Sequence, residues 1–294
     1  MLLREKPNVS HRAEADRVWR HVLTALAAAM TGGILLSSAA SGQEGSVTIV
    51  LPNIYLDYRT SFAALPPNVL SFGFRGLTAF SLSASASKSV SLDFPLSVDV
   101  SDRLSVWGGI TTGTSRTDTT SWSSMILNSW NVGFQADVYE QNGGSIPTLT
   151  IQGTLTRTVD LGPLTATSLN TIAELGYALN EDETRGWLAG VQLTTVAIVS
   201  DLAEIRPNIV GYIGGYYQWD SNWKFTGRIG VQSFSGARVI NAQLRPFTQP
   251  IVRLDLDRMD DNDNRLFGIS AEIAWTPKPA FQLTVRTPLY VVRN

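Results

Sequence analysis

Hydrophobic and polar residues alternate along most of the chain after residue 45, and this alternation predicts β-strands. In residues 130–139 the apolar positions are Trp130, Val132, Phe134, Ala136 and Val138. The positions between them are Asn131, Gly133, Gln135, Asp137 and Tyr139. A period of two places successive side chains on opposite faces of a strand, so one face of this segment is apolar and the other is polar.

The same pattern recurs in several other segments, and turn residues separate them. Clear examples are residues 148–156, 223–232, 267–275 and 281–286. Turn sequences include Ser101-Asp102-Arg103 and Asp220-Ser221-Asn222. We count roughly a dozen strands of about ten residues, which is the length that a tilted strand needs to cross a bilayer.

The positions of the tryptophans separate a membrane barrel from a soluble β-sandwich. Trp130, Trp187 and Trp223 are expected to open strands, and Trp219 and Trp275 to close them. Aromatic residues at strand ends are typical of the girdles that lie at the headgroup level of a bilayer, whereas a sandwich buries its tryptophans near strand centres. The polar faces also carry few charges for a soluble surface. We therefore predict an all-β fold for residues 43–294, a closed antiparallel transmembrane β-barrel of about 12 strands, with a range of about 10 to 14.

Four segments are expected to be exposed loops of this barrel. They are Thr111–Ser124, Asp160–Ser168, Ser235–Pro250 and Asp257–Arg265. These four do not fit strict up-and-down parity, so at least one strand in 237–257 is misassigned. The last segment belongs to the acidic run Asp255–Asn264, in which Asp260, Asn262 and Asn264 have the spacing of calcium ligands, but the run lacks the glycine and terminal glutamate of a calcium loop. A solvated acidic loop is the favoured interpretation.

The N-terminal region has the order of residues found in secretory signals. Five basic residues within the first 21 positions precede the uncharged stretch 22–42, which is rich in alanine and leucine and ends in small residues. We expect residues 1–42 to be a signal helix that is cleaved near Ala40 or Gly42. The alternative is a retained membrane anchor, because residues 22–40 are just long enough to span a bilayer. The predicted location is the bacterial outer membrane.

The composition excludes several kinds of chemistry. The chain has no cysteine, and its only two histidines, His11 and His21, lie in the predicted signal. Hydroxyl nucleophiles of barrel enzymes need a base such as histidine, and no segment gathers two carboxylates for glycosidase chemistry. The formal net charge of −2 offers no footprint for nucleic acid. We therefore expect no enzyme activity, no cofactor, no metal site and no nucleic-acid partner.

Three segments carry a resemblance to a known family. They are Phe94–Leu104, Trp130–Ala136, and Ile209–Trp219 with the short Asp-Ser-Asn turn that follows it. In these segments the chain resembles the outer-membrane transporters of the MetA pathway of phenol degradation. The resemblance implies a barrel that passes small, often hydrophobic molecules.

Function is expected inside the barrel, on the polar faces of the strands. The candidate lumen or constriction residues are Lys224, Arg228, Glu272, Arg286, Gln135, Asp137, Gln152 and Gln282. Glu272 and Arg286 are predicted to share a face within diagonal reach, so that they can form an ion pair. Two hypotheses remain open. The first is a channel for passive diffusion of small, neutral or hydrophobic solutes, and the second is a structural or surface-interaction barrel with a plugged lumen. Both include outer-membrane lipids and lipopolysaccharide as partners, and neither fixes the oligomeric state.

Overall fold

The structure is a computed structural model. It describes residues 52–67, 71–73, 76–79, 85–141, 143–159, 165–200, 203–239, 242–261, 265–275 and 279–292. The predicted signal segment, residues 1–42, lies outside these ranges. Within them, no helix has the length and apolar character needed to cross a membrane.

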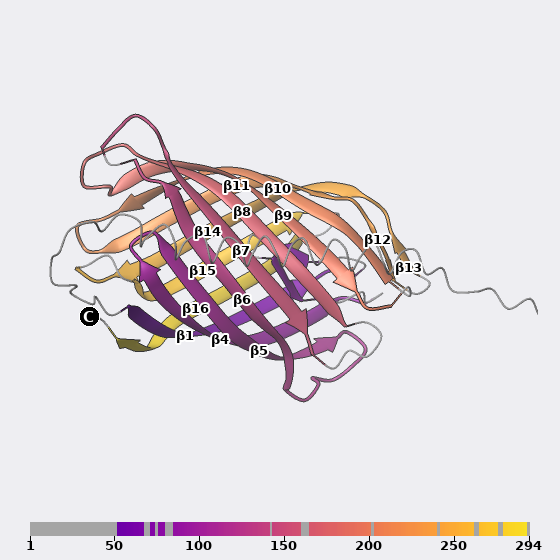
Figure 1. The fold of residues 1–294 in the computed structure, drawn as a ribbon. Coiled ribbons are helices and arrows are strands. Elements are labelled where there is room, and N and C mark those ends of the chain that lie inside the picture. Colours follow the sequence, from indigo (N-terminus) through magenta and orange to yellow (C-terminus); the bar gives the residue numbers. More distant parts are fainter. Residues whose placement is uncertain are drawn as a thin grey trace, which may run out of the picture. The chain divides into compact units, whose positions relative to one another are not determined.

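Twelve antiparallel strands form one closed ring, as predicted (Figure 1). In chain order they are β1 (Asn53–Leu65), β4 (Ser87–Ser101), β5 (Leu104–Thr117), β6 (Ile126–Tyr139), β7 (Thr148–Thr158), β8 (Ala166–Ala178), β9 (Arg185–Ile198), β10 (Ala203–Gln218), β11 (Trp223–Phe234), β14 (Phe247–Met259), β15 (Arg265–Trp275) and β16 (Pro279–Val292). Each strand pairs with its neighbours in this order, and the ring closes where yellow β16 lies beside indigo β1. Ser61 and Thr284 share a hydrogen bond of 2.8 Å across this closure. Closure leaves no strand edge in the ring without a partner.

Two short hairpins stand outside the ring. β2 (Ser71–Gly73) and β3 (Gly76–Ala79) pair only with each other in the described chain, between β1 and β4 in sequence. β3 nevertheless lies against β8, although β8 is four places away from β4 in the ring. The second hairpin joins β12 (Ala237–Val239) to β13 (Ala242–Leu244) and extends the sheet from the start of β10.

The two ends of the barrel differ in their longest connections, which have eight residues (140–147) at one end and 12 or more (235–246 and 66–86) at the other, whereas shorter connections occur at both ends. At the first, which we name the turn end, β4 and β5 are joined by residues 102–103, and β10 and β11 by residues 219–222. Asn222 adopts a positive φ of 60° there, a conformation that asparagine tolerates. β1 begins and β16 ends at the turn end. The opposite, loop end carries residues 118–125 between β5 and β6, and the segment with β12 and β13 between β11 and β14.

The predicted loop boundaries need correction. β5 continues to Thr117, so only the last part of Thr111–Ser124 is a connection, and Ser235–Pro250 contains β12, β13 and the first residues of β14. Asp257–Arg265 begins inside β14 and ends on β15. The prediction failed because inward-facing hydroxyls and carboxylates have the composition of a loop. Asp160–Ser168 is described only in part, with β8 beginning at Ala166, and Asn262 and Asn264 lie outside the described residues.

The tryptophans lie near strand ends with one qualification. Trp223 opens β11, Trp275 closes β15, and Trp219 directly follows β10. Trp187 is the third residue of β9, but Trp130 is only the fifth residue of β6, because β6 begins earlier than the alternation indicated. Trp187, Trp219 and Trp223 lie toward the turn end, and Trp130 and Trp275 toward the loop end.

Candidate solute path through the barrel

The strand register places the polar face of every ring strand toward the barrel interior. Inward residues alternate with exposed apolar residues, as in β10, where Val210 and Tyr212 are buried and Ile209 and Ile213 are exposed. All eight candidate lumen residues fall on inward faces, on β6, β7, β11, β15 and β16. They do not form one cluster, because those strands occupy different sides of the ring.

A network of charged side chains spans the interior from β8 to β14. Arg228 on β11 donates to Glu174 on β8, with 3.1 Å between Nε and Oε2, and to Asp255 on β14, with 3.1 Å between Nη1 and Oδ2. Arg253 lies directly opposite Arg228 and forms a 2.6 Å ion pair with the same Asp255. Asp255 thus lies between two guanidinium groups and offsets their mutual repulsion.

Tyr212 joins this network because residue 190 is a glycine. The Tyr212 hydroxyl donates to Glu174 Oε2 at 2.7 Å, so the ring on β10 must extend over β9 to reach β8. A Cβ at Gly190 would lie 2.5 Å from the Tyr212 hydroxyl and ring. The absence of a side chain at residue 190 therefore permits the contact that orients Glu174.

A second group of charges lies where β14, β15, β16, β1 and β4 adjoin. Arg286 forms an ion pair with Asp57 on β1, and Arg59 lies 3.8 Å from the same carboxylate. Asp257 pairs with Arg265 at 2.8 Å. The register puts Glu272 and Arg286 on one face, as predicted, but not within diagonal reach, because Glu272 lies opposite Gln282 and Arg286 opposite Gly268. Arg286 forms its ion pair with Asp57.

Neutral side chains fill the interior beside β8, β9, β10, β11 and β14. Gln232 donates to Asn208 at 2.9 Å and accepts a hydrogen bond from Gln249 at 2.6 Å. Thr194 donates to Asn170 at 2.9 Å. All these side chains are buried, and Val210 and Ile251 pack among them. Because these side chains are buried and bond to one another, this half of the interior is packed.

The opposite wall, formed by β4, β5, β6 and β7, is more open. Its inward residues are serine, threonine, glycine, asparagine and glutamine with a few carboxylates, and most are partly exposed. Gln135 is exposed, and Gln152, directly opposite it, is partly exposed. Asp137 accepts a hydrogen bond from Thr150 at 2.6 Å. This wall is mostly neutral and accessible, and Trp107 is a large aromatic residue on its inward face.

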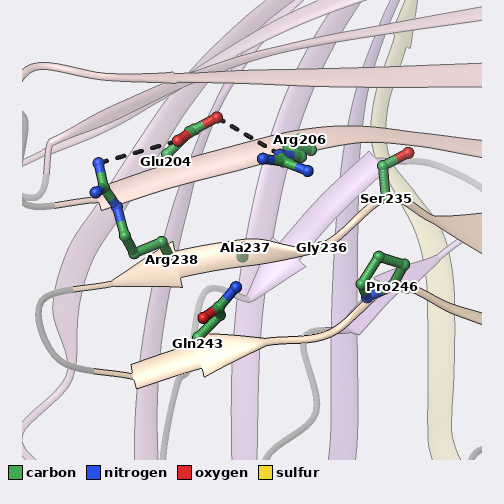
Figure 2. A pocket seen from close by; sticks show the side chains of 8 residues that line it. All are labelled: Glu204, Arg206, Ser235, Gly236, Ala237, Arg238, Gln243 and Pro246. Atoms are coloured by element: carbon green, nitrogen blue, oxygen red, sulfur yellow. Dashed lines mark ion pairs between the residues drawn. The ribbon is translucent and has the colours of Figure 1, made fainter.

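A pocket of about 350 Å³ lies at the loop end, against the β12–β13 hairpin (Figure 2). Glu204 on β10 forms ion pairs with Arg206 at 3.6 Å and Arg238 at 4.0 Å. All three side chains are more than half exposed. On β10, β11 and β12 the apolar residues Ile205, Phe234 and Ala237 pack together.

Sequence reasoning missed the partners of the charges that it found. It named Arg228 but gave it no partner, and it assigned Asp255 and Asp257 to a solvated acidic segment. The signal that could have found them is the apolar alternation at Val252, Leu254 and Leu256, which leaves the residues between them on the inward face. Trp107 was also missed, although it occupies an inward position of a strand.

Comparisons with known proteins find resemblances of fold alone, at low sequence identity. No family model matches the sequence, and no curated protein matches it either. An outer-membrane channel from Pseudomonas putida aligns over 85% of this chain and 100% of its own, with 10% identity and a TM-score of 0.48. The translocator domain of the autotransporter NalP from Neisseria meningitidis aligns over 90% of this chain and 95% of its own, with 11% identity and a TM-score of 0.45. A FadL homologue from Pseudomonas aeruginosa aligns over 81% of this chain and 91% of its own, with 8% identity and a TM-score of 0.40.

Proposed function

We propose that the protein is an outer-membrane channel through which small, neutral or hydrophobic molecules diffuse passively. The observation that carries this proposal is the partly exposed, mainly neutral wall formed by β4 to β7, inside a closed ring whose other half is packed. A path along this wall offers hydroxyl and amide groups rather than a dense field of one charge, so it favours uncharged solutes.

The outer face of the ring supports insertion into a bilayer. Large apolar side chains are exposed around it, and Ile229, in the middle of β11, is 57% exposed. Exposed apolar rows are costly in water and favourable in lipid. The tryptophans toward the two ends would form the two aromatic girdles, with Trp187, Trp219 and Trp223 in one and Trp130 and Trp275 in the other. Outer-membrane lipids and lipopolysaccharide are then the surroundings of the barrel.

The lengths of the connections indicate how the barrel is oriented in the membrane. Outer-membrane barrels have short periplasmic turns and longer extracellular loops, so the turn end would face the periplasm and the loop end the outside. Residues 1–42 would be removed during export. N-terminal sequencing of protein from an outer-membrane fraction tests the cleavage, and a retained residue 1 would contradict it.

Three measurements test the channel: cell fractionation, gel migration and conductance of the purified protein. The folded protein should fractionate with outer membranes and migrate differently on detergent gels before and after heating, because a closed barrel resists detergent until it is heated. Reconstituted into planar bilayers, it should then conduct ions in discrete steps. A soluble protein without heat-modifiable migration would overturn the membrane assignment, and an inserted barrel without conductance would overturn the channel.

One observation favours the second candidate, a surface-interaction barrel with a plugged lumen. β3 contacts β8, although the chain leaves the ring at β1 and re-enters it at the neighbouring strand β4. A direct route from β1 and β4 to β8 crosses the bore. If this segment closes the path, deletion of residues 68–84 should create conductance that the full chain lacks. Equal conductance of the two proteins would exclude the plug.

A further inference from the structure

We propose that Trp107 and three amide side chains beside it form a binding site for a neutral sugar ring on the wall of the path. This proposal rests on the proposed channel function and names a solute class for it. Trp107 on β5 lies directly opposite Gly133 on β6. Asn131 and Gln135 lie two residues to either side of Gly133, so they share its inward face. Gln152 on β7 is directly opposite Gln135.

The indole ring of Trp107 packs onto the wall at the position of Gly133. A Cβ at Gly133 would lie 2.5 Å from the Trp107 ring atoms Cε2 and Cζ2. The ring therefore occupies the space that a side chain at residue 133 would need. Because Trp107 is partly exposed, part of its surface remains open to the interior as a rigid apolar platform.

The three amides differ from those of the packed half in their hydrogen bonding. Asn208, Gln232 and Gln249 are buried and bond to one another. Within the described part of the chain, the side chains of Asn131, Gln135 and Gln152 have no hydrogen-bond partner and are partly or largely exposed. Each amide offers donors and an acceptor, so the site can exchange water for the hydroxyl groups of a solute.

This combination fits a neutral polyhydroxylated ring better than an ion or a plain hydrocarbon. One face of a pyranose presents C–H groups that pack on an aromatic face, while its hydroxyls need both donors and acceptors around the rim. A hydrocarbon would use the platform but leave the three amides desolvated without partners, which costs free energy. An anion would find no positive charge among these four side chains, and the neighbouring carboxylate of Asp137 already accepts a hydrogen bond from Thr150.

The test measures block of ion current by sugars in planar bilayers that contain the full-length protein. Maltose should reduce the wild-type current saturably, whereas sorbitol, an open-chain polyol, should reduce it only in proportion to solution viscosity. In Trp107→Ala the half-blocking concentration of maltose should rise about tenfold, equivalent to about 1.4 kcal/mol. Trp107→Phe should recover part of the affinity, since it keeps an aromatic face. Gln135→Ala should also weaken the block.

Trp275→Ala is the matched control, because Trp275 closes β15 on the outer face, away from this wall. Maltose should block the current of Trp275→Ala as it blocks that of the wild type. Equal block by maltose and sorbitol, or equal block of wild type and Trp107→Ala, would overturn the sugar site while leaving the channel intact. Absence of any current in the wild type would overturn the channel itself.

Discussion

Single residues inside the barrel act through partners that lie far away in sequence. Arg228 contacts Glu174, which is 54 residues earlier, and Asp255, which is 27 residues later. The alternation of the strand places Arg228 on the polar face, and this prediction depends on local spacing alone. Its partners depend on which strands adjoin in the ring and on a glycine at residue 190 that lets Tyr212 reach Glu174.

Replacing Arg228 with alanine is expected to destabilise the barrel. The change leaves Glu174 and Asp255 close together without the guanidinium that they share, and breaking such a buried network costs up to about 3–5 kcal/mol. Urea unfolding in detergent measures the loss of stability, with the folded fraction read from heat-modifiable migration on gels. Arg157→Ala is the control, because Arg157 is exposed near the end of β7. Equal midpoints for the two variants would contradict the role of Arg228.

Removing Arg286 or Glu272 is expected to shift ion selectivity in opposite directions. Arg286→Ala leaves Asp57 with less positive charge nearby and should raise the preference for cations, whereas Glu272→Ala should lower it. Reversal potentials in a KCl gradient measure both shifts, and Thr284→Ala, a neutral change on the same inward face, is the control. Unchanged selectivity and conductance in both variants would exclude these residues from the constriction.

Whole strands are amphipathic because each faces two different environments. β14 carries Arg253, Asp255 and Asp257 inward and Leu254 and Leu256 outward. Such a strand has the composition of a loop on one face and of a core on the other. Its apolar alternation was recognisable, but its charge density led to the wrong element boundaries, since charged side chains are rarely buried without partners.

An arginine at the middle of the outer face is expected to be costly. Ile229→Arg places a charge where the bilayer is most apolar, and the cost there is about 2–4 kcal/mol. Val100→Arg, near the end of β4, should cost only about 0–1 kcal/mol, because the side chain can reach the headgroups. Folding into lipid vesicles, titrated with urea, gives both values. Equal costs would indicate that Ile229 does not face lipid.

At the scale of the whole molecule, the even number of strands places the start of the first strand and the end of the last strand at the turn end of the barrel. The absence of cysteine makes the direction of the barrel measurable, since one introduced thiol is the only one in the chain. The shorter connections at the turn end and the longest connections at the loop end lead to one expected orientation of the barrel in the membrane.

Ser121→Cys, in the connection between β5 and β6, should react with a membrane-impermeant maleimide on intact cells. Ser221→Cys, in the turn between β10 and β11, should react only after the outer membrane is opened. Both positions are exposed, so access to the reagent is set by the side of the membrane. The reverse pattern would invert the proposed orientation, and labelling of both on intact cells would indicate a barrel that is not inserted.

The sequence alone determined that most segments are strands and which of their faces is polar, because a period of two is a local property of the backbone. It did not determine the strand boundaries within residues 111–124 and 235–265. It also determined that the chain has no cysteine and that both of its histidines lie within residues 1–42. Only the tertiary structure decided that one half of the interior is packed and the other is open. It also decided that Trp107 lies beside unbonded amides. These facts depend on the order and register of twelve strands around a ring, which joins residues that the chain holds far apart.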